Sequence, residues 1–395
     1  MALSPVDLAF TTLRALSGNW VRSGLTALGI FMGVAAVNAT LNIEAVSQTV
    51  IADRLAQMES PGFTPYIYAE DRPEPDLDEA VIANIKRSIP QVLDISRVMW
   101  LWEGEVQYQG TTPPESPTLQ AVSVNHQHTT GRRLVDGRFF ETADLDNFRA
   151  VVIIDQLLAE QLFEGISPLG ESLFIDSNRF TVIGVMESKK IWEEGQPSGT
   201  VWMTEAYGNL LHSIGQSEVR FALQGLDNYE QIEQALEAKL KEIFPGYDVF
   251  LWGNVAGLYQ EQQQQRAAIR VLKAVGILAL VIGGVGIANI TIAAIMERTR
   301  EIGLRRAIGA TDLEIMAQFI AEAALLSLLG GTAAVVAVHF ATKTATTTLF
   351  EAPYKFRPQD AALSMGAAFV IGVGSSLLPA LRITRIDVVQ ALRGE

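Results

Sequence analysis

The sequence predicts an α-helical membrane protein with four transmembrane helices and one extracytoplasmic α+β domain on a helical stalk. Two observations predict this fold class. Of the 395 residues, 49% are hydrophobic and only 19% are charged, yet the formal net charge is -14. One soluble globule seldom combines these properties. We therefore expect the apolar and the acidic residues to occupy different parts of the chain.

Four long stretches contain no charged residue. Their lengths are 21, 23, 20 and 21 residues, and they are 23–43, 274–296, 323–342 and 361–381. A helix needs roughly 20 apolar residues to cross a bilayer core, because it rises about 1.5 Å per residue. We predict one span in each of the segments 1–45, 271–296, 313–342 and 361–381.

Basic residues near the ends of the spans predict the topology. Nine of them would share one side of the membrane: Arg14, Arg22, Arg298, Arg300, Arg305, Arg306, Arg382, Arg385 and Arg393. The short loop 343–360 carries only three. Since short cytoplasmic loops are rich in Lys and Arg, we expect both termini, the loop 297–312 and the tail 382–395 in the cytoplasm of a plasma-membrane protein. Residues 46–270 would then lie outside, in the periplasm.

The negative charge belongs to that outer region. Residues 46–270 hold 33 acidic and 17 basic side chains, a net charge of -16, so the remaining residues carry +2. An acidic domain does not neutralise phosphates, which argues against a nucleic-acid partner. The chain has no cysteine, which excludes disulfides and thiolate zinc sites.

Two polar helical segments frame the outer domain and predict the stalk. The first, 44–58, continues span one, and the second, 259–273, runs into span two. The glutamine run 261–265 is helical in this interpretation, although it could instead be a low-complexity linker.

Between these segments, alternating and amphipathic patterns predict a split βαβ plan with a subdomain inserted at about 120–215. The expected strands of the plan are 64–69, 92–101, 105–109, 218–223 and 247–252, and its helices are 77–89 and 229–243. In the insertion we expect strands 151–154, 172–175 and 179–185 and a helix at 156–163.

No motif in the sequence predicts catalysis or a bound cofactor. There is no Walker A pattern for nucleotide phosphates. The glycines Gly283, Gly284 and Gly286 lie inside span two, where we expect them to let helices pack closely. His126-Gln-His128 could place two imidazoles on one side of a strand, but no third ligand is evident, and we expect a surface loop there rather than a metal site.

The segment after span two is the most informative part of the chain. Glu297, Glu301 and Arg305 follow one another at i, i+4 spacing, and Ile302, Ala307 and Ile308 supply apolar contacts. Thr311 and Glu314 form a capping box that begins the next helix. We predict a short charged helix at the membrane surface, continuous with span two. The alternative is a solvated loop held near anionic lipid.

This segment, 297–310, resembles the signature cytoplasmic loop of the FtsX/MacB-type ABC transporter permeases. Leu13–Val37 is similar to that family's entry into the first span. Asp136–Asp144, 168–175 and 180–185 resemble its MacB-type periplasmic core domain, and Pro379–Arg393 resembles its closing segment. The outer fold implied is a porter-like split βαβ domain.

The resemblance implies a non-catalytic permease subunit that binds no cofactor and whose ATP is bound by a partner ATPase. The loop after span two would be the coupling helix, a role that falls on Glu297, Arg298, Arg300, Glu301, Gly303, Leu304, Arg305, Arg306 and Gly309. MacB-like members form homodimers and work with a periplasmic adaptor protein and an outer-membrane channel. Their stalks transmit ATP-driven motion to the periplasmic domains, and this drives efflux.

Three departures from the family pattern stand out. MacB carries a fused ATPase domain, whereas Met1 lies only about 20 residues before span one, so we expect a separate ATPase chain. The segment 387–389 lacks a proline that many members have. The stretch 38–44 replaces glycines, so we expect different helix packing there.

Two other functions remain open within the family. One is an FtsX-like regulator of cell-wall hydrolases, and the other is a LolC/LolE-like permease that releases lipoproteins.

Overall fold

The computed structural model describes residues 20–101, 104–192, 199–211, 216–348 and 354–385. The sequence motifs at Leu13–Leu16, Arg14, 387–389 and Arg393 lie outside these residues. The described residues form two compact units, one from those within 1–50 and 263–395 and the other from those within 51–262.

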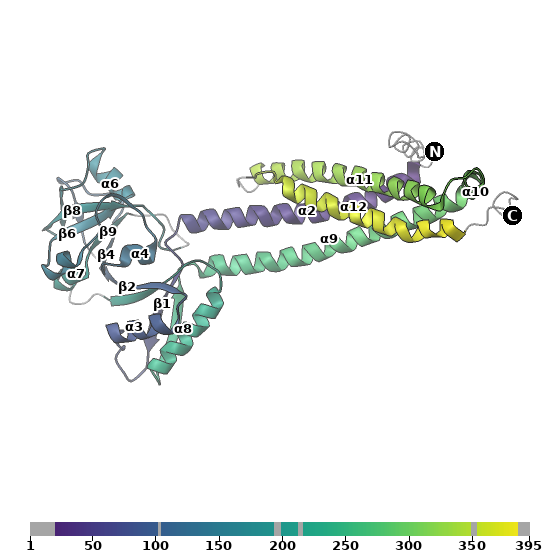
Figure 1. The fold of residues 1–395 in the computed structure, drawn as a ribbon. Coiled ribbons are helices and arrows are strands. Elements are labelled where there is room, and N and C mark those ends of the chain that lie inside the picture. The colour runs from purple at the N-terminus through teal and green to yellow at the C-terminus, as the bar shows by residue number, and fades with distance from the viewer. Residues whose placement is uncertain (1–19, 102–103, 193–198, 212–215, 349–353, 386–395) are drawn as a thin grey trace. The chain divides into compact units, whose positions relative to one another are not determined.

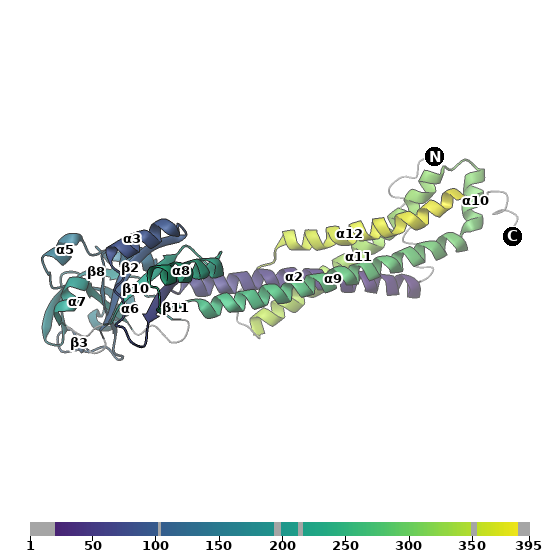
Figure 2. The same cartoon turned by 90° about the horizontal axis from the view of Figure 1, so that it is seen from below.

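The first unit is a bundle of long helices. Its elements are α2 (Trp20–Ala56), α9 (Ala256–Glu297), α10 (Thr299–Ala307), α11 (Asp312–Thr348), α12 (Pro358–Ala380) and the 3-10 turn η1 (Leu381–Arg385). Four helices of the described chain are long and apolar enough to cross a membrane, and they contain the four predicted spans. Figures 1 and 2 both show α11 and α12 side by side in the bundle. The four-span prediction is confirmed.

Glycines allow close approach between α2 and α9. A Cβ atom added at Gly283 would lie 3.1 Å from the backbone of Gly29, and one added at Gly33 would lie 2.8 Å from the backbone nitrogen of Leu280. A Cβ at Gly284 would approach the Ser375 hydroxyl of α12 to 2.5 Å, whereas one at Gly286 would meet nothing nearer than 4.0 Å. Small residues at such contacts let two helix backbones pack directly.

Polar side chains in the same bundle connect α2 to two other helices. The amide of Asn38 donates to the Ser364 hydroxyl of α12 over 3.0 Å. The amide of Asn42 reaches the Thr342 hydroxyl of α11 over 3.5 Å. Both asparagines are buried. Within the stretch 38–44, these hydrogen bonds link α2 to α11 and α12.

α2 and α9 each continue into the second unit. α2 ends at Ala56 and α9 begins at Ala256, so the predicted stalk segments are helical. The glutamine run 261–265 lies within α9, so the alternative of an irregular linker is wrong. Inside the second unit the two helices contact each other through an ion pair of 2.9 Å between Arg54 and Glu261.

The second unit contains one mixed sheet. Its strands are β1 (Gly62–Tyr68), β2 (Val92–Leu101), β3 (Val106–Gln107), β4 (Thr118–Val122), β5 (Leu134–Gly137), β6 (Val151–Asp155), β7 (Ser172–Ile175), β8 (Asn178–Met186), β9 (Thr200–Thr204), β10 (Gln216–Leu223) and β11 (Asp248–Gly253). The order is β11-β1-β10-β2-β4-β9-β6-β8-β7-β3, with β5 on β8.

The first four strands of that order form the predicted split βαβ unit. The pairs β11–β1, β1–β10 and β10–β2 are all antiparallel. Helices α3 (Glu79–Ser88) and α8 (Tyr229–Ile243) pack on one face of these strands, where Ile85, Phe221 and Leu236 are fully buried in a shared core. This arrangement of strands and helices is the ferredoxin-like one, so the predicted plan is confirmed for these four strands and two helices.

The rest of the sheet belongs to the insertion, which begins earlier than predicted. The strand predicted at 105–109 as part of the split βαβ unit is β3, and it pairs with β7 instead. The insertion therefore starts directly after β2 ends at Leu101, not near residue 120. Its helices are α4 (His126–Thr130), α5 (Thr142–Asp146), α6 (Gln156–Phe163) and α7 (Glu205–Leu211). Strand β4 pairs with both β2 and β9, so both parts share one continuous sheet.

Replacing Gly33 by alanine tests the α2–α9 contact. Because the new methyl group would clash with the Leu280 backbone, we expect Gly33→Ala to destabilise the bundle by about 1–3 kcal/mol. Gly24→Ala, in the same helix, is the matched control. Nothing lies within 4 Å of its Cβ position, so it should be neutral or slightly stabilising. Unfolding in detergent micelles measures both, and equal effects would contradict the packing argument.

Candidate functional site

Helix α10 lies at one end of the bundle, between α9 and α11 (Figure 2). A single residue, Arg298, separates it from α9. The backbone of Arg298 still accepts from the Ile302 amide over 2.9 Å, but its φ and ψ of -103° and 14° are not helical. The prediction that this helix is continuous with span two is therefore wrong. The break turns α10 into a separate short helix.

Three of the predicted coupling arginines contact side chains of α11. Arg305 donates to Gln318 over 2.7 Å and pairs with Glu301 at 2.5 Å, which confirms the i, i+4 pair. Arg298 pairs with Glu322 of α11 at 3.4 Å. Arg306 pairs with Asp312 at 2.8 Å. These guanidinium groups fix α10 on the start of α11.

The opposite side of α10 is open and partly apolar. Leu304 is 55% exposed and Ile308 is 80% exposed, although both are large apolar side chains. Their spacing places them one turn apart, next to Arg300, which is also exposed. The other exposed members of the predicted set are Glu297, Glu301 and Gly309, whereas Gly303 is buried. We call Arg300, Leu304 and Ile308 the outer face of α10.

The end of this segment has the predicted capping box. The Thr311 amide donates to the Glu314 carboxylate over 3.0 Å, and the Glu314 amide donates to the Thr311 hydroxyl over 3.3 Å. This pair satisfies two of the free amides at the start of α11. Gly309, with φ of +103°, makes the turn between the two helices.

A second candidate site lies in the α/β unit, at residues that no sequence pattern predicts. The Glu59 carboxylate is buried just after the end of α2. It accepts from Arg132 Nε over 3.0 Å and pairs with Arg220 Nη1 at 3.3 Å. Arg132 also donates to the backbone carbonyls of residues 187 and 189 and lies 4.9 Å from the centre of the Trp202 ring.

The charges of this cluster keep Glu59 ionised. Burial alone would raise the pKa of the Glu59 carboxyl, but the guanidinium groups of Arg132 and Arg220 outweigh it and hold the pKa below its usual value. An ionised carboxylate is therefore shared between two cations in the protein interior. Such an arrangement is stable only while all three groups are present.

His126 lies beside this cluster, at the start of α4. Its side chain is 1% exposed. The expected surface loop at 126–128 is instead the start of helix α4, in which His128 is exposed but the His126 ring is buried and contacts Ser96. Burial lowers the pKa of His126 to about 3, and the Glu59 carboxylate offsets this only in part. Within the described chain, no group of three or more His, Asp or Glu side chains is placed to hold a metal ion.

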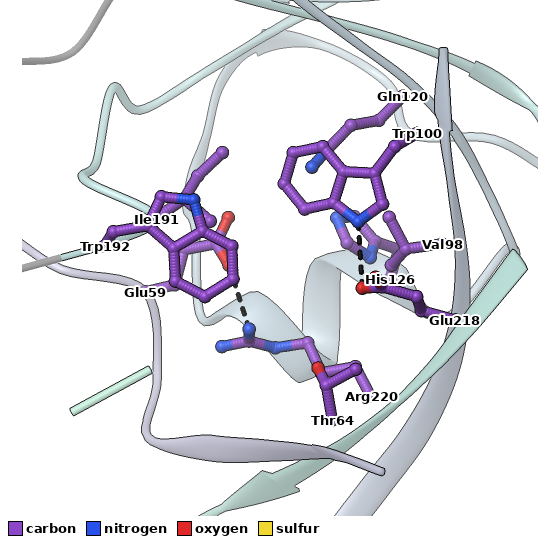
Figure 3. Close-up of a pocket in the computed structure, with 10 residues that line it drawn as sticks. All are labelled: Glu59, Thr64, Val98, Trp100, Gln120, His126, Ile191, Trp192, Glu218 and Arg220. Atoms are coloured by element: carbon purple, nitrogen blue, oxygen red, sulfur yellow. Dashed lines mark hydrogen bonds and ion pairs between the residues drawn. The ribbon is translucent and has the colours of Figure 1, made fainter. Parts of the chain in front are cut away.

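A small hollow opens next to His126 (Figure 3). Its walls include Trp100, Trp192 and Gln120, and its charged groups are Glu59, Glu218 and Arg220. Alternation along β10 explains the last two residues. Val219 and Phe221 face the helices α3 and α8, so Glu218 and Arg220 project from the opposite face of the sheet. Glu218 accepts from Tyr66 and from Trp100 Nε1, over 3.1 and 2.9 Å.

Comparison with protein families accounts for most of the chain. Residues 23–239 match the MacB-like periplasmic core domain, and residues 273–388 match the FtsX-like permease C-terminal domain. The first match alone covers more than half of the sequence. The chain belongs to the MacB-type permeases. In this family the α/β unit is the periplasmic core domain, and the four apolar helices belong to a membrane-embedded permease.

Individual relatives agree with this assignment. The chain is 29% identical over 394 residues to a macrolide export ATP-binding/permease protein MacB from Azoarcus sp. (strain BH72), covering 99% of this chain and 60% of the relative. A pyoverdine export ATP-binding/permease protein PvdT from Pseudomonas savastanoi pv. phaseolicola is 28% identical, with 99% and 60% covered. The chain thus spans about 60% of the length of these relatives.

A solved structure is also similar. The periplasmic region of MacB from Actinobacillus actinomycetemcomitans matches at 18% identity with a TM-score of 0.40, covering 54% of this chain and 98% of that structure.

Removing the Glu59 charge should destabilise the α/β unit severely. Glu59→Gln leaves two buried guanidinium groups without a counter-charge, so we expect the free energy of unfolding to fall by about 3–5 kcal/mol. The matched control is Glu242→Gln, which breaks an exposed pair with Lys239 and should cost less than about 1 kcal/mol. Denaturant unfolding followed by circular dichroism measures both. Similar losses in the two variants would show that the buried cluster is not a stabilising element.

His126 should make stability depend on pH. The buried ring stays neutral down to about pH 3, whereas in the unfolded chain it binds a proton below about 6.5. Stability is therefore lost as the pH falls below 6.5, by up to about 1.4 kcal/mol per pH unit. His126→Gln should reduce this slope between pH 6.5 and 5. Ordinary carboxyl groups have pKa values below this range, so they contribute little to the slope there. An unchanged slope would refute the assignment to His126.

Proposed function

We propose that this protein is a MacB-like permease that couples ATP hydrolysis by an ABC ATPase to motion of its periplasmic domain, and so drives efflux through a periplasmic adaptor protein. The observation that carries the proposal is the outer face of α10. Leu304 and Ile308 are apolar, neighbouring and exposed, and Arg300 beside them adds a charge. A pair of this kind on a short helix fits a pocket on a partner protein.

The internal contacts of α10 support a coupling role. Arg298, Arg305 and Arg306 hold the helix to α11 through several ion pairs and hydrogen bonds. A partner that moves α10 would therefore pull on the start of α11, and through the short break at Arg298 on the end of α9. Because α9 continues into the α/β unit, movement at α10 has a helical route toward the periplasmic domain.

The remaining parts of the proposal follow the family. We propose that the chain acts as a homodimer, that it binds no cofactor itself and catalyses no reaction, and that ATP binds to the partner ATPase. The acidic periplasmic domain would contact the adaptor, which would lead to an outer-membrane channel. The basic residues near the ends of the spans support cytoplasmic termini and a cytoplasmic α10.

Charging the outer face of α10 tests the coupling contact. We expect Leu304→Asp combined with Ile308→Asp to weaken binding of the ATPase at least about tenfold, because two carboxylates would have to be buried in the interface. The measurement is copurification of the ABC ATPase with the full-length chain, together with the ATPase activity of the complex in nanodiscs.

The control variant is Leu210→Asp, which changes a Leu that is 68% exposed on α7 in the α/β unit. It should leave the ATPase bound. Thermal unfolding of each variant shows whether the fold is intact. If no ATPase copurifies with the unmodified protein, or if the double variant binds it as well as the unmodified protein does, the proposed coupling surface is wrong.

A further inference from the structure

The two central strands of the split βαβ unit separate soon after they meet. Within the described sheet, β1 and β10 pair at only two positions, and the second of these is Phe63↔Phe221. Each strand continues for five more residues, 64–68 in β1 and 216–220 in β10. Over these residues both strands stay paired on their other sides, β1 with β11 and β10 with β2. We call the opening between 64–68 and 216–220 the β1–β10 gap.

Pro65 explains why the pairing stops. The Leu223 amide donates to the Pro61 carbonyl over 2.7 Å. Because the backbone groups of successive residues alternate between the two sides of a strand, the odd-numbered residues of β1 direct theirs toward β10 and the even-numbered ones toward β11. Pro65 has no N–H to donate toward β10. On the β11 side nothing is lost, so that pairing continues through Tyr68.

A cavity of about 120 Å³ lies in the β1–β10 gap. Its walls include three consecutive residues of each strand, 65–67 and 217–219. The volume is several times what one water molecule needs. Ser217 in its wall is exposed, so the cavity opens to solvent. The two strands are therefore separated by open space and not by packed side chains.

Both strands border this space with backbone groups that a neighbouring strand normally engages. If β1 and β10 kept their register, Ile67 would face Ser217, but this pair is not formed in the described sheet. Strand segments without a neighbour are a template for another extended chain, which pairs with them through its own backbone. The β1–β10 gap is such a template.

The charged side chains in the cavity wall are mostly acidic. They are Glu74, Asp76, Glu218 and Arg97. Arg97 is already engaged, because it donates to the Leu77 carbonyl over 2.9 Å and lies 3.8 Å from the carboxylate of Glu205. Three carboxylates of the wall are thus opposed by one guanidinium group, which is shared with a fourth carboxylate.

Tyr66 shows that two of these carboxylates act at one place. Its hydroxyl donates to Glu218 over 3.1 Å. Burial, together with the negative charges of Glu218 and Glu74, raises the pKa of Tyr66 to about 12. The β1–β10 gap therefore has a negative potential, which favours a cationic ligand.

The loop between β1 and α3 directs acidic residues to the gap. Among residues 69–78, only Arg72 is basic. Its guanidinium group lies 5.7 Å from the centre of the Tyr247 ring, in the connection between α8 and β11. Glu74 and Asp76 of the same loop line the cavity. The loop thus adds negative charge to the gap while its one basic side chain contacts another part of the unit.

We propose that the β1–β10 gap binds an extended segment of a protein partner that carries lysine or arginine side chains. The backbone of this segment forms hydrogen bonds with the strand groups that border the gap. Its basic side chains lie near Glu74, Asp76 and Glu218. Backbone pairing supplies affinity, and the carboxylates select the partner by charge. This surface lies in the α/β unit, so its occupation needs no contact at α10 and no ATPase.

The test uses a thiol placed in the gap. The chain has no cysteine, so Ser217→Cys introduces a single reactive group at an exposed position of the cavity wall. The full-length variant is studied in nanodiscs of phosphatidylcholine, a lipid without net charge, and the rate of labelling by a maleimide is measured. The probe is an amidated hexapeptide of alternating lysine and valine. We expect it to slow labelling at least about fivefold at saturation, with a dissociation constant of about 10–100 µM.

Two comparison peptides separate strand pairing from charge. A hexapeptide of alternating lysine and proline has the same charge but lacks every second backbone N–H. One of alternating glutamate and valine can pair as a strand but has the opposite charge. Neither should slow labelling at concentrations up to about 1 mM. The control for position is Ser177→Cys, in the exposed turn between β7 and β8, whose labelling the lysine–valine peptide should leave unchanged.

Reversing the charge of the loop tests the selection by carboxylates. In the Ser217→Cys background, Glu74→Lys combined with Asp76→Lys should weaken binding of the lysine–valine peptide at least about tenfold. Both side chains are exposed, and thermal unfolding checks that the variant is folded. The matched control is Asp146→Lys combined with Glu160→Lys, which makes the same change of net charge at exposed positions of the insertion and should retain binding.

Three results would overturn the proposal. The first is labelling of Ser217→Cys that the lysine–valine peptide does not slow at concentrations up to about 1 mM. The second is equal slowing by the lysine–proline peptide, which would make the gap a site for cations without strand pairing. The third is a charge-reversed loop that binds the peptide as tightly as the matched control does. None of these results bears on the ATPase contact at α10, which is measured separately.

Discussion

The α/β unit depends on one carboxylate held between two guanidinium groups. Glu59 follows the end of α2, Arg132 lies in the short connection between α4 and β5, and Arg220 lies on β10, between β1 and β2 in the sheet. Arg132 adds hydrogen bonds to the carbonyls of residues 187 and 189. The cluster therefore joins four segments that are far apart in the sequence. Since each buried charge needs the others, these segments cannot separate without a large cost.

The same cluster shapes its surroundings. Two cations near His126 make a charged imidazole unfavourable, in addition to the effect of burial, so the ring stays neutral. Within the described chain, Nε2 of His126 and Nε of Arg220 are buried without a hydrogen-bond partner. Glu59 and Arg220, which line the hollow beside Trp100 and Trp192, therefore also form an ion pair that stabilises the fold.

The membrane unit uses its charges in a different way. Three arginines at or next to α10, to which the family resemblance assigns contact with a partner, are engaged with α11. The free surface of the helix comes from Leu304 and Ile308. Spacing alone placed Glu301 and Arg305 together correctly, because an i, i+4 pair is local. Contacts of Arg305 with Gln318 and of Arg298 with Glu322 join two helices, so no local pattern could reveal them.

The sequence by itself determined the four apolar helices, the acidic outer domain and the split βαβ order. These features follow from hydrophobic length, charge segregation and periodicity, which are local properties of the chain. Only the tertiary structure decided that β3 pairs with β7, because alternation marks a strand but not its neighbour. It also decided that His126 is buried and that Glu59, Arg132 and Arg220 meet. Single charged residues in unrelated segments carry no pattern, and their meeting depends on how distant strands and helices pack.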